Sequence, residues 1–168
     1  MVIGTTGLDQ QHKDLFAEMA KDIPMVVSSN MSIGVNLLYK LAYAAAKKLP
    51  KTFDADISET HHRHKKDAPS GTAVKILEEV QRARGGKPVY QRQSSDQVRG
   101  DDEIGMVSLR AGDIVGEHSV IFTGPGEVLE LSHRAHSRRV FAEGALLAAK
   151  FAVKAKPGLY DMQDVLGL

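Results

Sequence analysis

The first thirty residues contain two kinds of hydrophobic pattern, short apolar runs and a helical spacing. Residues 1–3 and 23–27 form short apolar runs that are typical of buried strands. Between them, residues 8–21 place Leu15, Phe16 and Met19 at near-helical spacing. A strand, a helix and a second strand in this order predict a β-loop-α-β unit, which implies a parallel sheet.

The next segment, residues 33–48, again has the helical period. Ser32 precedes it as the predicted N-cap, two lysines occupy its last turn, and Pro50 ends it. From Phe53 onward the period changes to that of a strand, because apolar and polar residues alternate up to Ser58. The chain therefore passes from a parallel α/β part to a different kind of part, with the boundary near residues 30–34.

The remaining pattern predicts an α+β arrangement with a mixed or largely antiparallel sheet. A helix is expected from Gly71 to about Arg84, where Gly85 and Gly86 end it. A hairpin turn is expected at residues 123–126. The other expected elements are strands at 88–91, 105–110, 117–122 and 127–136, a helix at 139–154, and a tail at 159–168.

Composition narrows the class of protein. The chain has 168 residues, of which 42% are hydrophobic and 26% charged, as in a folded globular protein. Its net charge of +1 argues against a general affinity for nucleic acid or a membrane surface. Cysteine is absent, which excludes disulfides and thiolate metal sites and is compatible with a cytoplasmic location. No segment is predicted to span a membrane.

Residues 59–73, Glu-Thr-His-His-Arg-His-Lys-Lys-Asp-Ala-Pro-Ser-Gly-Thr-Ala, carry the strongest chemical signal. Three of the seven histidines fall here, with fixed positive charge among them. Imidazole suits proton transfer near neutral pH, and a helix that starts at Ser70 can hold a carboxylate or phosphate at its N-terminus. The segment predicts acid catalysis on an anionic substrate. Two alternatives stay open: a solvated basic strand end, and a zinc site, which the neighbouring cations disfavour.

A second ligand-binding edge is predicted in the parallel part. Gly4-Thr5-Thr6-Gly7 follows the first strand and precedes a helix, which is where doubly wound folds bind ligands. Ser28, Ser29 and Asn30 follow the second strand, hence at the same sheet edge. Either loop alone can be an ordinary glycine-permitted turn, but two loops at one edge favour a shared crevice.

The run at residues 59–73 closely resembles the signature of the dihydrodipicolinate reductase family of lysine and diaminopimelate biosynthesis. The resemblance continues through four further motifs: Val-Ile-Gly-Thr-Thr-Gly at 2–7, Asn-Met-Ser-Ile-Gly-Val-Asn at 30–36, Arg-Ala-Gly-Asp-Ile-Val-Gly-Glu-His at 110–118, and Gly-Leu-Tyr-Asp-Met at 158–162. It implies an oxidoreductase that transfers hydride from NADH or NADPH to a cyclic unsaturated dicarboxylate, giving tetrahydrodipicolinate.

The resemblance also implies residue roles. His61 would be the proton donor and Lys65 its catalytic partner. His62, Gly71 and Thr72 would hold the substrate carboxylates. The nicotinamide side of the cofactor site would be lined by Gly4, Thr5, Thr6, Ser28, Ser29, Asn30 and Met31. No metal is implied.

The implied fold is the C-terminal remnant of a Rossmann-like dinucleotide-binding domain (residues 1–31), a substrate-binding and tetramerisation domain (32–138), and a C-terminal helix and tail that return to the first domain (139–168). The family opens with a Gly-rich phosphate-binding loop that these 168 residues lack, so we expect an upstream part to be missing. A cytoplasmic homotetramer is expected. The alternative function is a non-catalytic dicarboxylate-binding and oligomerisation domain, and a metal-binding module ranks third.

Overall fold

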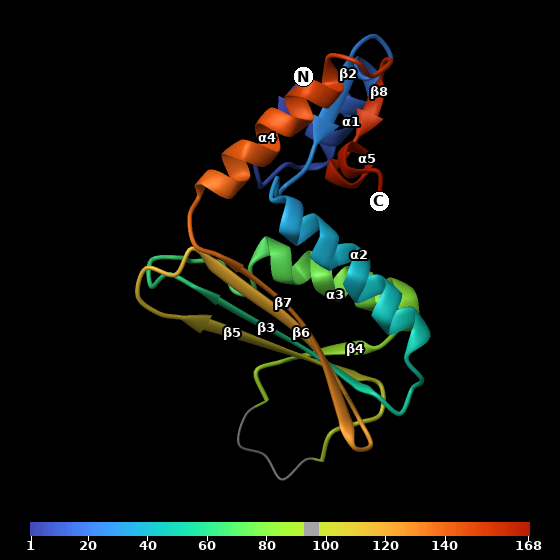
Figure 1. Cartoon of the computed structure of the whole chain (residues 1–168), viewed down its shortest axis with the longest axis vertical. Coiled ribbons are helices and arrows are strands. Elements are labelled where there is room, and N and C mark those ends of the chain that lie inside the picture. Colours follow the sequence, from blue (N-terminus) through green and yellow to red (C-terminus); the bar gives the residue numbers. More distant parts are fainter. Residues whose placement is uncertain (93–97) are drawn as a thin grey trace. The chain divides into compact units, whose positions relative to one another are not determined.

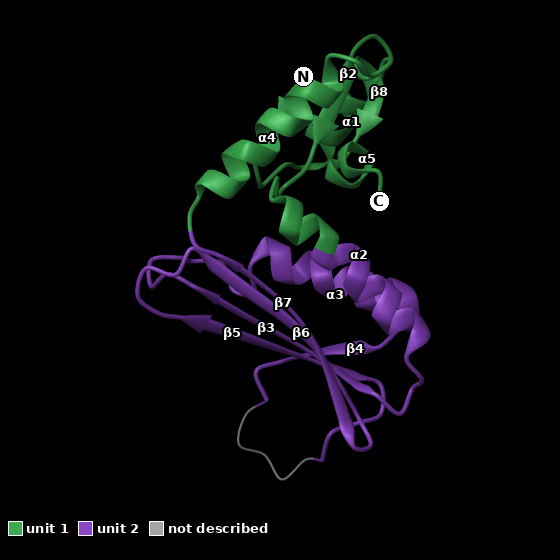
Figure 2. Ribbon diagram, in the orientation of Figure 1, with its two compact units in different colours: residues 1–37, 137–168 green, residues 38–136 purple. Residues whose placement is uncertain are grey.

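The computed structural model describes residues 1–92 and 98–168. It divides the chain into two compact units (Figure 2). Unit 1 contains residues 1–37 and 137–168, and unit 2 contains residues 38–136. Helix α2 (Ile33–Lys48) contains the change from one unit to the other, and Ser32 caps its start by accepting a hydrogen bond from the backbone N–H of Val35 at 3.3 Å.

Unit 1 is built on a parallel sheet of order β1-β2-β8. Strands β1 (Val2–Ile3) and β2 (Pro24–Val27) are joined through helix α1 (Gln10–Met19), as the hydrophobic pattern predicts. After helix α4 (Arg139–Ala152), strand β8 (Gly158–Tyr160) pairs with β2, and helix α5 (Met162–Leu166) follows.

The segment expected as a tail, residues 159–168, thus contains most of β8 and the whole of α5. Strand β8 has only three residues, too few to show the alternation that identifies a strand in a sequence. Its partner β2 supplies the order instead, because Met25 lies opposite Leu159 in the register. Helix α5 has a capping box, in which Asp161 and Asp164 each accept hydrogen bonds from backbone N–H groups at the helix start.

The core of unit 1 brings the two ends of the chain together. Its buried residues are Val26, Met31, Ala148, Ala152 and Met162. Small residues of α4 let the helix lie against the chain after β2, most closely at Gly144. A Cβ atom at Gly144 would lie 1.7 Å from the carbonyl oxygen of Met31, so no side chain fits there.

Unit 2 contains a mixed sheet of order β4-β5-β3-β6-β7. Strands β4 (Lys87–Tyr90), β5 (Glu103–Arg110) and β3 (Asp54–His61) run parallel, while β6 (Gly116–Gly124) and β7 (Glu127–Ala135) continue from β3 as an antiparallel pair. Helix α3 (Gly71–Arg84), at its expected bounds, connects β3 to β4, and such a crossover gives parallel strands.

Helices cover one face of this sheet. Figure 1 shows α3 and most of α2 along the same side, and buried residues of β3 alternate strictly with half-exposed ones. Ala55 and Ile57 lie on the covered side with Glu59 and His61. On the opposite side, Val107, Leu109 and Val128 are 43%, 55% and 61% exposed. The sheet therefore has one core face and one open, partly apolar face.

Gly144 provides a test of the unit 1 core. We expect Gly144→Ala to lower the free energy of unfolding by at least 1–3 kcal/mol, the usual scale of overpacking, because the new methyl group collides with backbone. Urea unfolding followed by circular dichroism measures the effect. Leu146→Ala is the matched control, since Leu146 lies on the same helix and is 64% exposed. Equal stabilities of the two variants would contradict the close approach of α4 to Met31.

Candidate active site

The histidine run occupies the end of β3 and the loop that leads to α3. His61 is the last residue of β3, and Ser70 caps α3 through a hydrogen bond from the N–H of Ala73 to its Oγ at 3.2 Å. Backbone bonds hold the loop against the segment after β5: Ala111 N–H donates to the carbonyl of His61, and Arg63 N–H donates to that of Gly112. These bonds therefore hold the loop after β3 next to the segment that follows β5.

A buried carboxylate, Glu59, lies at the centre of this region. Glu59 is 1% exposed. Its Oε2 accepts from Nδ1 of His61 at 2.5 Å and from Nη1 of Arg110 at 2.9 Å. Its Oε1 accepts from Nη2 of Arg110 at 2.9 Å and from the backbone N–H of Ser70 at 3.1 Å. One side chain thus joins the end of β3, the end of β5 and the start of α3.

These hydrogen bonds keep Glu59 ionised. Burial alone would raise the pKa of Glu59, because it disfavours the charged form. Donors from Arg110, His61 and Ser108 outweigh that cost and lower the pKa to about 2. At neutral pH Glu59 is therefore a carboxylate that only accepts hydrogen bonds.

His61 is 9% exposed, so its imidazole is largely shielded from water. Burial lowers its pKa, and the neighbouring Glu59 carboxylate opposes that change. Near the other ring nitrogen, a Cβ atom at Gly116 would lie 3.1 Å from Nε2. A proton held on Nε2 would thus face a position without a side chain.

A second buried histidine, His118, stands beside His61. Their rings meet edge to face with centroids 5.0 Å apart, and Nε2 of His118 lies 3.1 Å from Oγ of Ser70. His118 is 4% exposed. Burial, reinforced by the nearby His61, lowers its pKa to about 3, so His118 is neutral at physiological pH.

The other residues expected at the substrate site lie in the loop after β3 and in the first turn of α3. Nζ of Lys65 pairs with Oδ1 of Asp67 at 2.9 Å, and Lys65 is 21% exposed. The ring of His62 lies 6.4 Å from that of His64, in the loop. Gly71 is the first residue of α3, and a Cβ atom there would meet nothing within 4 Å. Thr72 follows it in the same first turn, half-buried.

The expected cofactor residues gather at one edge of the unit 1 sheet. Gly4, Thr5 and Thr6 follow β1, and Ser28 follows β2. The backbone N–H of Ser28 donates to the carbonyl of Ile3 at 3.0 Å. The second loop is internally bonded: Ser28 Oγ donates to the carbonyl of Asn30, and Oδ1 of Asn30 accepts from the N–H of Ser32. Ser29 is exposed in this loop.

Met31 differs from its neighbours in this set. It is 4% exposed and belongs to the core of unit 1. Its side chain packs below the first loop, because a Cβ atom at Gly4 would lie 3.5 Å from the Met31 side chain. Met31 therefore supports the loop edge from the interior.

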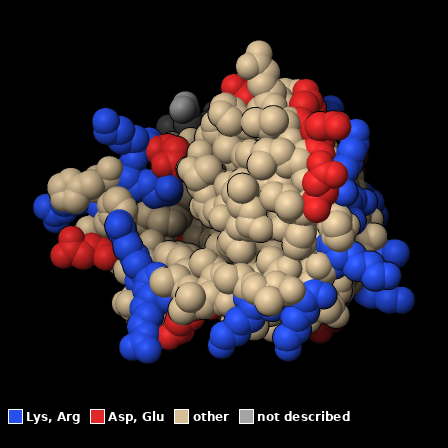
Figure 3. Space-filling view, turned by 90° about the horizontal axis from the view of Figure 1, so that it is seen from above, with Lys and Arg blue, Asp and Glu red and all other residues tan. Residues whose placement is uncertain are grey.

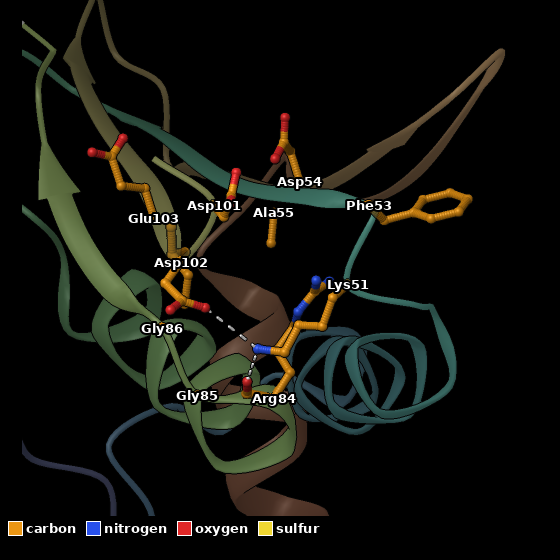
Figure 4. A pocket seen from close by; sticks show the side chains of 11 residues that line it. Lys51, Phe53, Asp54, Ala55, Arg84, Gly85, Gly86, Asp101, Asp102 and Glu103 are labelled. Carbon is orange, nitrogen blue, oxygen red and sulfur yellow. Dashed lines mark hydrogen bonds and ion pairs between the residues drawn. The ribbon is translucent and has the colours of Figure 1, made fainter. Parts of the chain in front are cut away.

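The cavity in Figure 4 lies elsewhere in unit 2. It surrounds the start of β3, near Lys51, Arg84 and Asp102, whereas the histidine run begins at the end of that strand. Lys51 donates there to the carbonyl of Arg84 and lies 3.8 Å from Asp102. At about 3.3 Å per residue, β3 separates the two places by more than 20 Å. The hydrogen bond and the ion pair of Lys51 link the end of α3 to the segment before β5, far from the histidines.

Two broader properties bear on the candidate functions. Among residues 1–92 and 98–168, no three histidine, aspartate or glutamate side chains are placed to hold a metal ion, and no helix is long and apolar enough to cross a membrane. On the face shown in Figure 3, cationic and anionic side chains both lie mainly around the margin of the view, and neither sign covers the face.

Comparison with known proteins supplies the family. The family model described as dihydrodipicolinate reductase, C-terminus, matches residues 34–166, and the one described as dihydrodipicolinate reductase, N-terminus, matches residues 1–31. The chain belongs to the dihydrodipicolinate reductase family. The two matched segments include the loops after β1 and β2 and the whole of residues 59–73.

Individual members of the reductase family are similar over the whole chain. The 4-hydroxy-tetrahydrodipicolinate reductases of Nitrosomonas europaea and Citrifermentans bemidjiense are 50% and 51% identical to it, each over 100% of this chain. The chain spans 64% of the length of these relatives. A solved dipicolinate-bound dihydrodipicolinate reductase from Paenisporosarcina sp. TG-14 has a TM-score of 0.77 and 27% identity, covering 97% of this chain and 63% of that one.

Sequence reasoning did not select three residues that the structure places with His61: Glu59, Arg110 and His118. For Glu59 a signal exists. It lies two residues before His61 and in phase with Ala55 and Ile57, so the alternation places a carboxylate on the buried face. Arg110 and His118 join through cross-strand register, with Arg110 opposite His61 and His118 opposite Glu59, which no local pattern specifies.

His118 provides a test of burial at this site. In the unfolded chain a histidine has a pKa near 6.5, whereas folding lowers that of His118 to about 3. As pH falls from 6.5 toward 3, the unfolded state binds a proton at this histidine and the folded state does not. The free energy of unfolding therefore decreases by up to about 1.4 kcal/mol per pH unit. We expect His118→Gln to make the loss of stability between pH 6.5 and 4 shallower.

Urea unfolding at a series of pH values measures this slope. His136→Gln is the control, because it also removes a histidine, and His136 is exposed just after β7. An unchanged slope in His118→Gln would show that His118 is accessible to protons in the folded state.

Proposed function

We propose that this chain carries the substrate site and the nicotinamide side of the cofactor site of an NAD(P)H-dependent oxidoreductase. The reaction is the reduction of dihydrodipicolinate, or its 4-hydroxy-tetrahydrodipicolinate precursor, to tetrahydrodipicolinate in lysine and diaminopimelate biosynthesis. The observation that supports it most is the buried Glu59–His61 pair beside the N-terminus of α3, in a chain of the dihydrodipicolinate reductase family.

The geometry suits proton donation by His61. A shielded imidazole next to a permanent carboxylate can hold a second proton and release it to a bound substrate. Lys65, in the loop that follows, supplies positive charge on the substrate side and is the proposed catalytic partner. Its pairing with Asp67 is mostly exposed on the Asp67 side, so a substrate carboxylate can replace Asp67 as its partner.

The proposed carboxylate-holding residues are His62, Gly71 and Thr72. The N-terminus of a helix favours anions through its dipole and its N–H groups, and α3 is 14 residues long. At Gly71 the absence of a side chain leaves the backbone open to a ligand. A dipicolinate-bound relative of the same fold supports a planar dicarboxylate as the ligand.

The cofactor proposal rests on the loops after β1 and β2. Backbone without a side chain at Gly4, the exposed hydroxyls of Thr5 and Thr6, and the ordered loop of Ser28, Ser29 and Asn30 fit a polar, flat group such as a carboxamide-bearing ring. Met31 would shape this surface from below. When bound, NADH or NADPH supplies the hydride; these residues would only bind and orient its nicotinamide end. The remaining third of the relatives' length has no counterpart in these 168 residues.

Assembly and location complete the proposal. We propose that the parent protein is a homotetramer that associates through the open face of the unit 2 sheet, supported by the exposure of Val107, Leu109 and Val128 there. The division into a cofactor part at 1–31, a substrate and assembly part at 32–138 and a returning segment at 139–168 stays a prediction, as does the cytoplasmic location.

The second candidate is a non-catalytic dicarboxylate-binding and oligomerisation domain. Its supporting observation is that unit 2 by itself contains the proposed dicarboxylate-holding residues and the open sheet face. The two candidates differ in whether the cofactor affects ligand binding.

Calorimetric titration with pyridine-2,6-dicarboxylate tests the binding site. We expect saturable binding to this chain, and a roughly tenfold weaker Kd in His62→Gln and in Thr72→Val, because each substitution removes a hydrogen bond to a charged group. His64→Gln is the matched control, since His64 lies in the same loop and is exposed. Equal weakening in all three variants would contradict the assigned roles.

Repeating the titration with NADH separates the candidates. Stronger dicarboxylate binding in its presence supports the reductase, whereas binding that is indifferent to NADH favours the non-catalytic domain. Absence of dicarboxylate binding under both conditions contradicts both.

Turnover tests His61 directly. In a chimaera that joins this chain to the N-terminal third of the Nitrosomonas europaea relative, we expect His61→Gln to reduce kcat by roughly 100-fold or more, the usual scale for loss of a general acid. The rate of NADPH or NADH oxidation, followed by absorbance, measures it. Turnover within a few-fold of the unsubstituted chimaera would remove His61 from the proton-donating role, and His64→Gln controls for the loss of a loop histidine.

A further inference from the structure

We propose that Glu59 is the positioning residue for His61: it fixes the imidazole as the tautomer protonated on Nδ1, so that Nε2 is the atom that carries and releases the catalytic proton. Only the statement that this proton is used in catalysis rests on the proposed function. The tautomer and its cause follow from contacts within unit 2 alone.

The first step is that Glu59 has no proton to share. Both of its oxygens accept hydrogen bonds, from Arg110 in a two-pronged pair and from the N–H of Ser70. A carboxylate held in this way is acceptor-only. Because Nδ1 of His61 lies 2.5 Å from Oε2 of Glu59, that nitrogen must be the donor, and the neutral ring keeps its hydrogen on Nδ1.

The second step concerns Nε2. With Nδ1 protonated in both states, titration of His61 occurs on Nε2 alone. When the cation gives up its proton, the Nε2–H bond breaks and its electron pair stays on the ring; the neutral ring then regains a proton from solvent. Nε2 lies beside Gly116, where a Cβ atom would approach within 3.1 Å, so the position keeps side-chain bulk away from the proton.

The third step explains why the carboxylate itself does not move. Glu59 is anchored to three elements, since His61 ends β3, Arg110 ends β5 and Ser70 caps α3. Nη2 of Arg110 also donates to the carbonyl of Asp67 at 2.5 Å, which ties the loop after His61 to the same guanidinium. The Glu59 side chain therefore fixes the positions of both the His61 ring and the N-terminus of α3, which is proposed to hold the substrate carboxylate.

Besides burial, which lowers it, charged and titratable neighbours from several elements affect the pKa of His61. Glu59 on its own strand favours the cation, while Arg110 from β5 and Lys65 from the following loop disfavour it. His118 from β6 contacts the ring edge and stays neutral. Removing the negative charge of Glu59 should thus lower the pKa of His61, and removing the positive charge of Arg110 should raise it.

Long-range proton–nitrogen NMR correlation of the imidazoles in this chain tests the inference, with His61 assigned from its absence in His61→Gln. We expect Nδ1 protonated and Nε2 unprotonated in neutral His61. Relative to wild type, we expect a lower His61 pKa in Glu59→Gln and a higher His61 pKa in Arg110→Gln. Glu79→Gln is the matched control: Glu79 is also a buried carboxylate, in α3, and pairs with Lys75 and Arg82.

Three results would overturn the inference: a wild-type ring protonated on Nε2 in its neutral form, a His61 pKa equal in wild type and Glu59→Gln, or an equal shift in Glu79→Gln. If Glu59→Gln does not fold, the wild-type tautomer and the opposite shift in Arg110→Gln still decide. These readouts need neither substrate nor turnover, so a failure of dicarboxylate binding would reject the proposed function and leave the role of Glu59 in orienting His61 intact.

Discussion

The candidate site depends on the burial of one ionised carboxylate. Removing a charge from water is costly unless it is paired and fully hydrogen-bonded, and Glu59 meets that condition through Arg110, His61 and the N–H of Ser70. Because these partners come from different strands and a helix start, the charge is satisfied only when β3, β5 and α3 are all in place. The geometry of the candidate site and the folding of unit 2 therefore depend on the same contacts.

The sheet topology explains how such a group can be assembled. Strand β3 has a parallel neighbour on one side and an antiparallel neighbour on the other, so its end meets the carboxyl end of β5 and the amino end of β6. Arg110 and His118 thereby reach the same pair of residues from opposite sides. A purely antiparallel arrangement would place a strand start beside both edges of His61, and Arg110, as the last residue of its strand, would lie elsewhere.

Local patterns predict most of the secondary structure and the position of the histidine run, and for physical reasons. A helix such as residues 71–84 can be predicted from its capping serine, its periodic apolar face and the glycine pair that ends it. By contrast, β8 owes its order to pairing with β2, and the grouping of Arg110 and His118 around Glu59 owes its existence to register. Such long-range effects leave no trace in spacing. The roles of His62, Lys65 and Thr72 come from the family resemblance and stay predictions.

Unit 1 is discontinuous in the chain, because β1 and β2 lie near the start while α4, β8 and α5 lie at the end. On a ribosome, which releases a chain from its N-terminus, residues 38–136 are all synthesised before β8, the second partner strand of β2, exists. Unit 2 can therefore reach its native state during translation, whereas the sheet of unit 1 is complete only when synthesis has passed β8. In the living cell, the residues around Glu59 in unit 2 would reach their positions first, and the core of unit 1 would be completed last.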